Sequence, residues 1–246
     1  MKENAIKTSA LTNRISLQNN QSLDLNKWIF DKLKVNDNPK ILELCCGTGA
    51  QTNFLTKIIG KGSLDCVDIN KETVEANRSM VANKDISYHV SSIDEIHNYE
   101  LESIDLIFSA YGFYYSKDPV SLHKELHRKL SRGGKFVLVG PVLGNNIELY
   151  EIMKRIGVKV NKDVLYSSER FMLEMEEVFL NYYENVSFSR VLNKINYSSA
   201  NDLLEYWKNT TFYDLSKEKE FLSEVDDFYN NGIVITKSIS YLEGQA

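Results

Sequence analysis

The residues best suited to chemistry lie in one short segment, ILELCCGTGAQT, at positions 41–52. It starts as an apolar strand, turns through Gly47 and Gly49, and continues with a helical pattern. Glycines in such a turn let the backbone approach a ligand closely, because no Cβ intervenes. Ligands of open α/β sheets bind beyond the carboxyl ends of the strands, so we expect a ligand at this turn.

Two common ligands are disfavoured at this turn. A dinucleotide fingerprint would need glycine at Thr52, and the turn carries Cys45 at its first position. The Gly-Lys-Ser/Thr sequence of a phosphate loop is absent. A carboxylate at Glu43 suits a ligand with an ammonium or sulfonium group better than a pyrophosphate. A tight turn without any ligand is the alternative.

A second candidate is Asp68, at the end of the strand-like segment LDCVDIN, about twenty residues after the turn. A carboxylate at that strand end can accept both hydroxyl hydrogens of a ribose. An exposed aspartate that caps the next helix is the competing interpretation.

Two later segments complete a series. IDLIFSAYGFYYSKDP spans residues 104–119 and HKELHRKLSRGGKFVLVG spans 123–140. With the turn and Asp68, their order and spacing resemble class I S-adenosylmethionine (SAM)-dependent methyltransferases of the small-molecule type, over about residues 39 to 140. The resemblance implies an α/β fold, with a Rossmann-like, mostly parallel seven-stranded sheet, helices on both faces and a small helical cap.

The resemblance also implies roles for individual residues. The turn would wrap the methionine part of SAM, Asp68 would hold the ribose hydroxyls, and Ile69 would pack on the adenine. Cys45 stands where the family usually has its first glycine. Ser92 and Ile93 align with the pair that meets the adenine, and Asp94 is a substitute for that contact. The implied cofactor-binding residues are Glu43, Cys45, Cys46, Gly47, Gly49, Asp68, Ile69, Ser92, Ile93, Ser109 and Ala110.

Three tyrosines after the fourth expected strand, Tyr111, Tyr114 and Tyr115, are the candidate catalytic residues on the acceptor side. A partly buried aromatic cluster is the alternative. His123 and His127 are four residues apart on an expected helix, but charged neighbours and the lack of a third ligand favour helix surface over a metal site.

The acceptor is expected to be a small molecule. The Pro-Pro motif of many base N-methyltransferases is missing after the fourth strand, and the net charge of −5 disfavours nucleic acid. O-methylation is favoured slightly over N- or C-methylation. A protein that binds SAM or S-adenosylhomocysteine (SAH) without turnover is one alternative, and a nicotinamide-dependent enzyme is a weaker one.

Composition and periodicity give the expected organisation of the 246 residues. Three cysteines fit a reducing cytoplasm, and no apolar run reaches the ~18 residues of a membrane span. We expect a flexible arm at 1–20, a SAM-binding core at 21–142, a helical cap or lid at 143–185, and final strands and helices that complete the sheet at 186–246. Asn70 and Asp118 are placed to cap helices. Expected strands are 40–44, 63–67, 86–90, 104–109, 135–140, 186–197 and 233–241.

Overall fold

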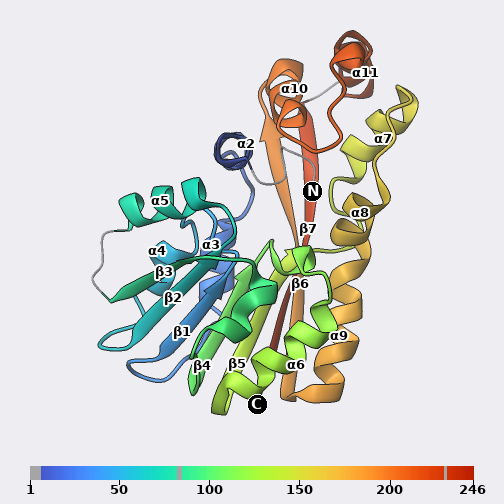
Figure 1. Ribbon diagram of the computed structural model, residues 1–246. Coiled ribbons are helices and arrows are strands. Elements are labelled where there is room, and N and C mark those ends of the chain that lie inside the picture. Colours follow the sequence, from blue (N-terminus) through green and yellow to red (C-terminus); the bar gives the residue numbers. More distant parts are fainter. Residues whose placement is uncertain (1–6, 82–84, 230–231) are drawn as a thin grey trace. The chain divides into compact units, whose positions relative to one another are not determined.

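The computed structural model describes residues 7–81, 85–229 and 232–246, and its seven strands form one sheet (Figure 1). Their order is β3-β2-β1-β4-β5-β7-β6. The strands are β1 (Lys40–Leu44), β2 (Ser63–Asp68), β3 (Ile86–Val90), β4 (Ile104–Ala110), β5 (Leu130–Pro141), β6 (Glu184–Tyr197) and β7 (Ile233–Gln245). The α/β fold and the seven-stranded sheet expected from the sequence are confirmed.

The strand order reverses next to β1. The chain first builds outward on one side through β2 and β3, and then returns to place β4 and β5 on the other side. All four of these pairs are parallel, so their carboxyl ends share one edge of the sheet. A reversal of this kind opens a crevice between two neighbouring strand ends, here those of β1 and β4.

Two of the helices begin at the caps predicted from the sequence. The side chain of Asn70 accepts hydrogen bonds from the first-turn amides of α5, and that of Asp118 accepts from Ser121 at the start of α6. These bonds satisfy amides that have no partner within the helix. The helices are α2 (Thr8–Ser16), α3 (Leu25–Phe30), α4 (Thr52–Leu55), α5 (Lys71–Met80), α6 (Pro119–Lys129), α7 (Ile147–Arg155), α8 (Lys162–Leu165), α9 (Phe171–Tyr182), α10 (Ala200–Lys208) and α11 (Glu218–Phe228).

Aromatic side chains cover the sheet on both faces. Phe108 of β4 stacks with Phe30 of α3, at a centroid distance of 5.7 Å. Phe136 of β5 pairs with Ile107, the neighbour of Phe108 in β4. Because successive side chains of a strand point to opposite faces, Phe136 lies on the other face of the sheet from Phe108. There its ring lies 5.4 Å from that of Phe179 in α9. The expected helices on both faces are therefore present.

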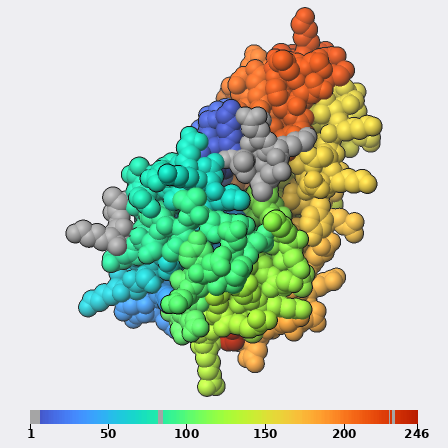
Figure 2. All heavy atoms as spheres, viewed as in Figure 1, coloured from blue at the N-terminus to red at the C-terminus, as the bar shows by residue number. Residues whose placement is uncertain are grey.

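The chain divides into two compact units. The sheet unit comprises residues 26–140, 171–190 and 240–246, and the accessory unit comprises the residues up to 25, 141–170 and 191–239. Within the sheet unit, the segments from α5 to α6 form a continuous surface on the face drawn in Figure 2. Strands β6 and β7 each belong to both units along their own length.

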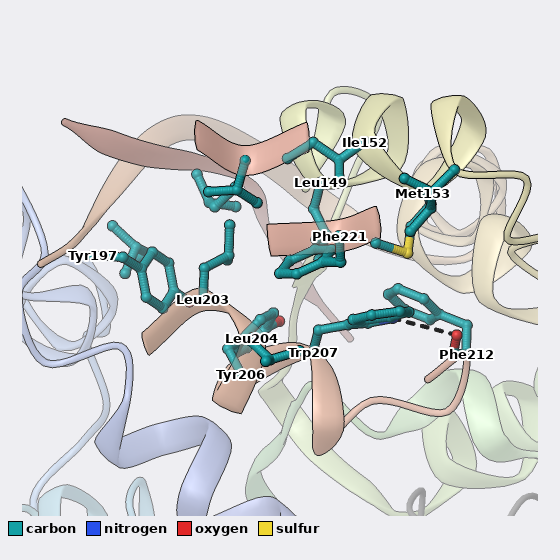
Figure 3. Packing of buried hydrophobic residues seen from close by; sticks show 14 residues of the cluster. Leu149, Ile152, Met153, Tyr197, Leu203, Leu204, Tyr206, Trp207, Phe212 and Phe221 are labelled. Carbon is teal, nitrogen blue, oxygen red and sulfur yellow. Dashed lines mark hydrogen bonds between the residues drawn. The ribbon is translucent and has the colours of Figure 1, made fainter. Parts of the chain in front are cut away.

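The accessory unit has a hydrophobic core of its own (Figure 3). Trp207 is fully buried there and its ring stacks on that of Phe221 at 4.6 Å. Its indole nitrogen donates to the carbonyl oxygen of Phe212, which satisfies the polar end of a buried ring. The buried members of this core are Leu149, Ile152, Met153, Ile156, Ile195, Tyr197, Leu203, Leu204, Tyr206, Trp207, Phe212, Phe221, Val225 and Ile235.

The structure differs from the sequence-based expectations at several places. The segment expected to be a flexible arm, 1–20, contains α2, whose Ala10 is buried; residues 1–6 lie outside the described residues. Arg14 and Asn13 tie this helix to Asn209, a long-range contact that its polar composition does not reveal. The expected cap, 143–185, is divided between the two units at residue 170, where α8 and a π-helical turn give way to α9. Its action as a lid stays a prediction.

Two boundaries near the sheet are also corrected. The helix expected after the glycine turn is short and ends at Leu55. The strand expected at 135–140 starts earlier, at Leu130, and includes Gly133 and Gly134 where its pairing with β4 is irregular. Glycine within a strand often marks such a place.

A buried histidine of α6 titrates in an unusual environment. The His123 side chain is fully buried among the rings of Phe136, Phe179, Tyr182 and Tyr183. Neither ring nitrogen has a hydrogen-bond partner among the described residues. Burial, with the nearby charges of His127 and Lys124, lowers its pKa from 6.5 to about 4.

We predict that His123 makes the protein acid-sensitive. Because its folded-state pKa is lowered, the unfolded chain takes up the proton first, and stability is lost as the pH falls from about 6.5 toward 4. Between pH 7 and pH 4.5 the loss should be about 2 to 3 kcal/mol. Urea unfolding of the wild type and of His123→Leu over this range measures it. Parallel curves for the two proteins would contradict the prediction.

Candidate functional site

The turn after β1 has a conformation that few side chains tolerate. Cys45, Gly47 and Gly49 all have positive φ, at 57°, 55° and 94°. The Cys46 amide donates to the carbonyl oxygen of Val67 at 3.1 Å, so the chain stays attached to β2 as it leaves the sheet. Two of the three left-handed positions carry glycine, as the sequence led us to expect. The third carries a cysteine.

A glycine in the segment after β4, Gly112, makes room for the side chain of Cys45. A Cβ added to Gly112 would lie only 2.1 Å from the Cβ of Cys45 and 2.6 Å from its sulfur. The side chain that Cys45 adds to the turn therefore occupies the space that Gly112 leaves empty. The sequence analysis did not single out Gly112, although a glycine between two aromatic residues at a strand end is a detectable signal.

A chain of buried hydrogen bonds holds the turn from behind. The Thr52 hydroxyl donates to the carboxyl group of Glu43 at 2.6 Å, and the side-chain amide of Asn77 donates to Thr52 at 2.9 Å. The same amide nitrogen lies 3.4 Å from the carbonyl oxygen of Gly47, and the Tyr88 hydroxyl donates to the Asn77 oxygen at 3.3 Å. Glu43, Thr52 and Asn77 are all buried.

Glu43 has a different environment from the one we expected. Burial raises its pKa to about 8, and the hydrogen bonds from Thr52 and Cys66 only partly oppose this effect. The group is thus mostly a neutral acid at pH 7. Its hydrogen bond with Thr52 holds the turn, and its role in binding the cofactor stays a prediction.

Asp68 closes the turn from the side of β2. One carboxylate oxygen accepts from the Gly47 amide at 3.0 Å, and the other accepts from Asn70 at 3.0 Å. Burial raises its pKa, opposed by these backbone hydrogen bonds. Asp68 is half-buried, so it lies at the surface of the turn. Its neighbour Ile69 is 54% exposed, which leaves an apolar side chain in solvent beside the carboxylate.

The expected adenine contacts are arranged less simply. Ser92 caps the short helix Ile93–Asn98, and the Ile93 side chain is buried. The Asp94 carboxylate accepts from the Ser116 hydroxyl at 2.6 Å and from the Lys117 amide at 3.2 Å. Asp94 thus joins this segment to the one after β4. Which of Ser92 and Asp94 contacts the adenine stays a prediction.

The residues at the end of β4 connect the sheet to the aromatic segment. Ser109 is buried and donates to the carbonyl oxygen of Leu44 at 3.1 Å, so it fastens the end of β4 to that of β1. Ala110 is half-buried, and Tyr111 follows with a φ of 58°. A left-handed tyrosine is uncommon and is a place where backbone strain is held.

Tyr114 and Tyr115 belong to one aromatic cluster. Their ring centroids are 4.7 Å apart, and the Tyr114 ring lies 5.8 Å from that of Phe171. Tyr115 is 42% exposed. This packing is the partly buried aromatic cluster that the sequence analysis gave as the alternative to a catalytic role. The Tyr115 side chain remains partly exposed.

The described residues contain no group of three or more histidine, cysteine or acidic side chains placed to hold a metal ion. The ring centroids of His123 and His127 are 6.4 Å apart. The expectation that both lie on the helix surface is wrong for His123, which is buried among aromatic rings. The three cysteines are free thiols. Burial raises the pKa of Cys45, and the hydrogen bond between the Cys66 and Cys46 thiols, together with burial, raises that of Cys66.

Comparison with known proteins agrees with this geometry. Residues 42–138 match the methyltransferase domain family. Among curated proteins, malonyl-[acyl-carrier protein] O-methyltransferase 1 of Ilyobacter polytropus is 26% identical over 196 residues, covering 72% of each chain. Demethylmenaquinone methyltransferase of Staphylococcus epidermidis is 27% identical over 138 residues, and the alignment covers 53% of this chain and 54% of that enzyme. This chain thus spans about half the length of the latter relative.

Solved structures share the fold at low sequence identity. The YcgJ protein of Bacillus subtilis superposes with a TM-score of 0.65 at 14% identity, covering 89% of this chain and 97% of that one. A Haemonchus contortus phosphoethanolamine N-methyltransferase in complex with SAH gives a TM-score of 0.55 at 15% identity, covering 89% and 52%. The solved structures thus share this fold, and residues 42–138 of the chain are similar to the methyltransferase domain family.

Gly49 provides a test of how the turn is held. A Cβ at Gly49 would lie 2.5 Å from the Asn77 side-chain oxygen and 2.9 Å from the Met80 methyl carbon, so the space is used by the protein's own packing. We predict that Gly49→Ala lowers the free energy of unfolding by about 1 to 2 kcal/mol from backbone strain and by roughly 1 to 3 kcal/mol more from overpacking.

Gly157→Ala is the matched control, because Gly157 also has a positive φ, of 76°, but nothing lies within 4 Å of an added Cβ. It should show the strain alone. Urea denaturation of both variants separates the two effects, and equal losses would refute the role of Asn77.

Proposed function

We propose that this protein transfers a methyl group from SAM to a small-molecule acceptor, with oxygen as the favoured nucleophile. The observation that carries the proposal is the turn after β1, clamped by Asp68 at the reversal of the strand order. The malonyl-[acyl-carrier protein] relative is named as an O-methyltransferase, which supports the choice of oxygen.

The residues at the turn fit the cofactor. Asp68 presents a half-buried carboxylate at a strand end, as a ribose diol requires, and the exposed Ile69 offers an apolar surface for a base. Bound SAM would supply an electrophilic methyl group on its sulfonium. The turn at Cys45–Gly49 would hold its methionine part, and Ser92 or Asp94 would contact the adenine.

The protein's own contribution is to orient the acceptor and the cofactor relative to each other and to enclose them. In-line transfer requires the acceptor atom and the methyl carbon to meet at the correct distance and angle, so rigid placement of both supplies most of the rate. Ser109 and the backbone of Ala110 would set the methionine end of the site, because Ser109 is fixed to β1. Tyr111, Tyr114 and Tyr115 would face the acceptor, and their hydroxyls would form hydrogen bonds that orient it.

Several features of the chain bear on partners. Among the described residues, no helix is long and apolar enough to cross a membrane. The acidic net charge of −5 supports a small acceptor over nucleic acid. A cytoplasmic location, expected from the cysteine content, stays a prediction.

The test of cofactor binding is Asp68→Asn. An amide accepts fewer hydrogen bonds from a diol than a carboxylate does and lacks its charge, so SAH affinity should fall by about 2 kcal/mol, roughly 30-fold. Asp65→Asn is the control, since Asp65 lies on the same strand but pairs with His89. Isothermal titration with SAH measures both. Unchanged affinity in folded Asp68→Asn would remove the basis of the proposal.

Turnover over a panel of hydroxyl, amine and thiol acceptors, with SAH release as the readout, then distinguishes an enzyme from a protein that only binds SAM. Binding of SAH without transfer to any member would favour the latter. Binding of NADH in place of SAH would favour a nicotinamide enzyme.

A further inference from the structure

A lysine lies inside the accessory unit without an acidic partner. Lys237 of β7 is only 8% exposed. Its ammonium group donates to the side-chain oxygen of Asn146 at 2.6 Å and to the hydroxyl of Tyr206 at 2.8 Å. Among the residues that the structure describes, it forms no ion pair with a carboxylate. Buried lysines are normally paired, because an unbalanced charge is costly to remove from water.

The two side chains that accept from the Lys237 ammonium group, Asn146 and Tyr206, carry no formal charge in their ordinary states. Glu148 of α7 accepts from both the amide and the hydroxyl of Thr236, the residue before Lys237. Arg14 of α2, which donates to the carbonyl oxygen of Asn209, also acts on Tyr206 through its charge. Among the described residues, the ammonium group therefore has hydrogen-bond acceptors around it but no carboxylate in hydrogen-bond contact.

One further donor in the cluster lacks a partner. The hydroxyl of Tyr197 is buried and has no hydrogen-bond partner among the described residues. Its ring lies 5.9 Å from that of Tyr206, and Figure 3 shows both at the same end of the accessory core. A buried hydroxyl without a partner lowers stability, because its hydrogen bonds to water are lost and not replaced.

We propose that Lys237, Asn146, Tyr206 and Tyr197 form a binding site for the carboxylate of a small organic ligand. A carboxylate supplies the missing negative charge and has enough acceptor sites for the ammonium group and the hydroxyls. That this ligand is the methyl acceptor rests on the function proposed above. Its binding in the accessory unit does not.

The same surroundings favour a ligand with an apolar body. Tyr197 and Tyr206 belong to the accessory core, in which Leu149, Leu203 and Phe221 are fully buried. Inorganic phosphate would gain the charge contacts but nothing from these side chains. An aromatic or aliphatic carboxylate would use both.

The titration of Tyr206 is consistent with a site that stabilises negative charge. Burial alone would raise its pKa, but the charge of Lys237, the hydrogen bond from that ammonium group and the charge of Arg14 together lower it. An oxygen at this position is thus more easily ionised than an ordinary phenol.

The test uses the full chain and sodium benzoate as the probe. Because a ligand that binds only the folded state stabilises it by mass action, Tm should rise with benzoate over a millimolar series. Benzamide, which has the same shape without the charge, and inorganic phosphate, which has the charge without the ring, should raise it less at equal ionic strength. Sodium chloride sets the baseline.

Two variants and one control assign the effect. Lys237→Met and Tyr206→Phe should each weaken benzoate binding by about tenfold or more, since each removes a contact to a charged ligand. Lys208→Met removes a positive charge from the same unit, where Lys208 pairs with Glu205, and should respond like the wild type. Tyr206→Phe keeps the test valid where Lys237→Met does not fold.

The outcomes separate the two proposals. A wild type that does not respond to benzoate, or responds equally to benzamide, overturns the carboxylate site. So do variants at Lys237 and Tyr206 that respond as the wild type does. SAH binding on the same samples reports on the methyltransferase function independently, because it depends on Asp68 in the sheet unit.

Discussion

Buried, hydrogen-bonded side chains hold the turn between β1 and α4 from the interior of the protein. Thr52 and Asn77 come from two different helices and meet over the neutral carboxyl group of Glu43. Each of these polar groups is buried, so each must keep its partner or cost free energy. The network therefore fixes α4 and α5 to the end of β1 in a single arrangement. The strained backbone from Cys45 to Gly49, and with it the shape offered to a ligand, follows from that arrangement.

Close packing extends the same constraint to β4. The side chain of Cys45 fills the space beside Gly112, which has no side chain of its own. The end of β1 and the segment after β4 therefore pack closely only with a glycine at this position. Ser109 adds a hydrogen bond between the two strand ends. The edge of the sheet where the strand order reverses is consequently rigid, whereas Ile69 and Tyr115 beside it remain exposed. Rigid backbone next to exposed apolar and aromatic groups is the usual composition of a binding site.

The periodicity of the sequence was enough to locate the strands. β1 and β3 have the predicted bounds, because short apolar runs flanked by polar turns have few other ways to be buried. Asn70 and Asp118 cap helices as predicted, since capping depends on neighbouring residues only. The structure joins the Gly47–Gly49 turn to Asp68 by a hydrogen bond, and the roles of these residues in cofactor binding stay predictions.

What the sequence did not predict depends on contacts between distant residues. Asn77 was not identified, although it is a polar residue on the buried stripe of α5 with Thr73 and Val74. The neutral state of Glu43 follows from burial that only the folded chain creates. The division of residues 143–185 was missed for the same reason, because its helical pattern continues through the π-helical turn that separates the two units.

The path of the chain between the units has a further consequence. The polypeptide passes from one to the other after residues 25, 140, 170, 190 and 239, and three of these passages lie inside strands. Neither unit is therefore a contiguous stretch of sequence that could be inherited, duplicated or exchanged by itself. An insertion or deletion in β6 or β7 would shift the register of both units at once.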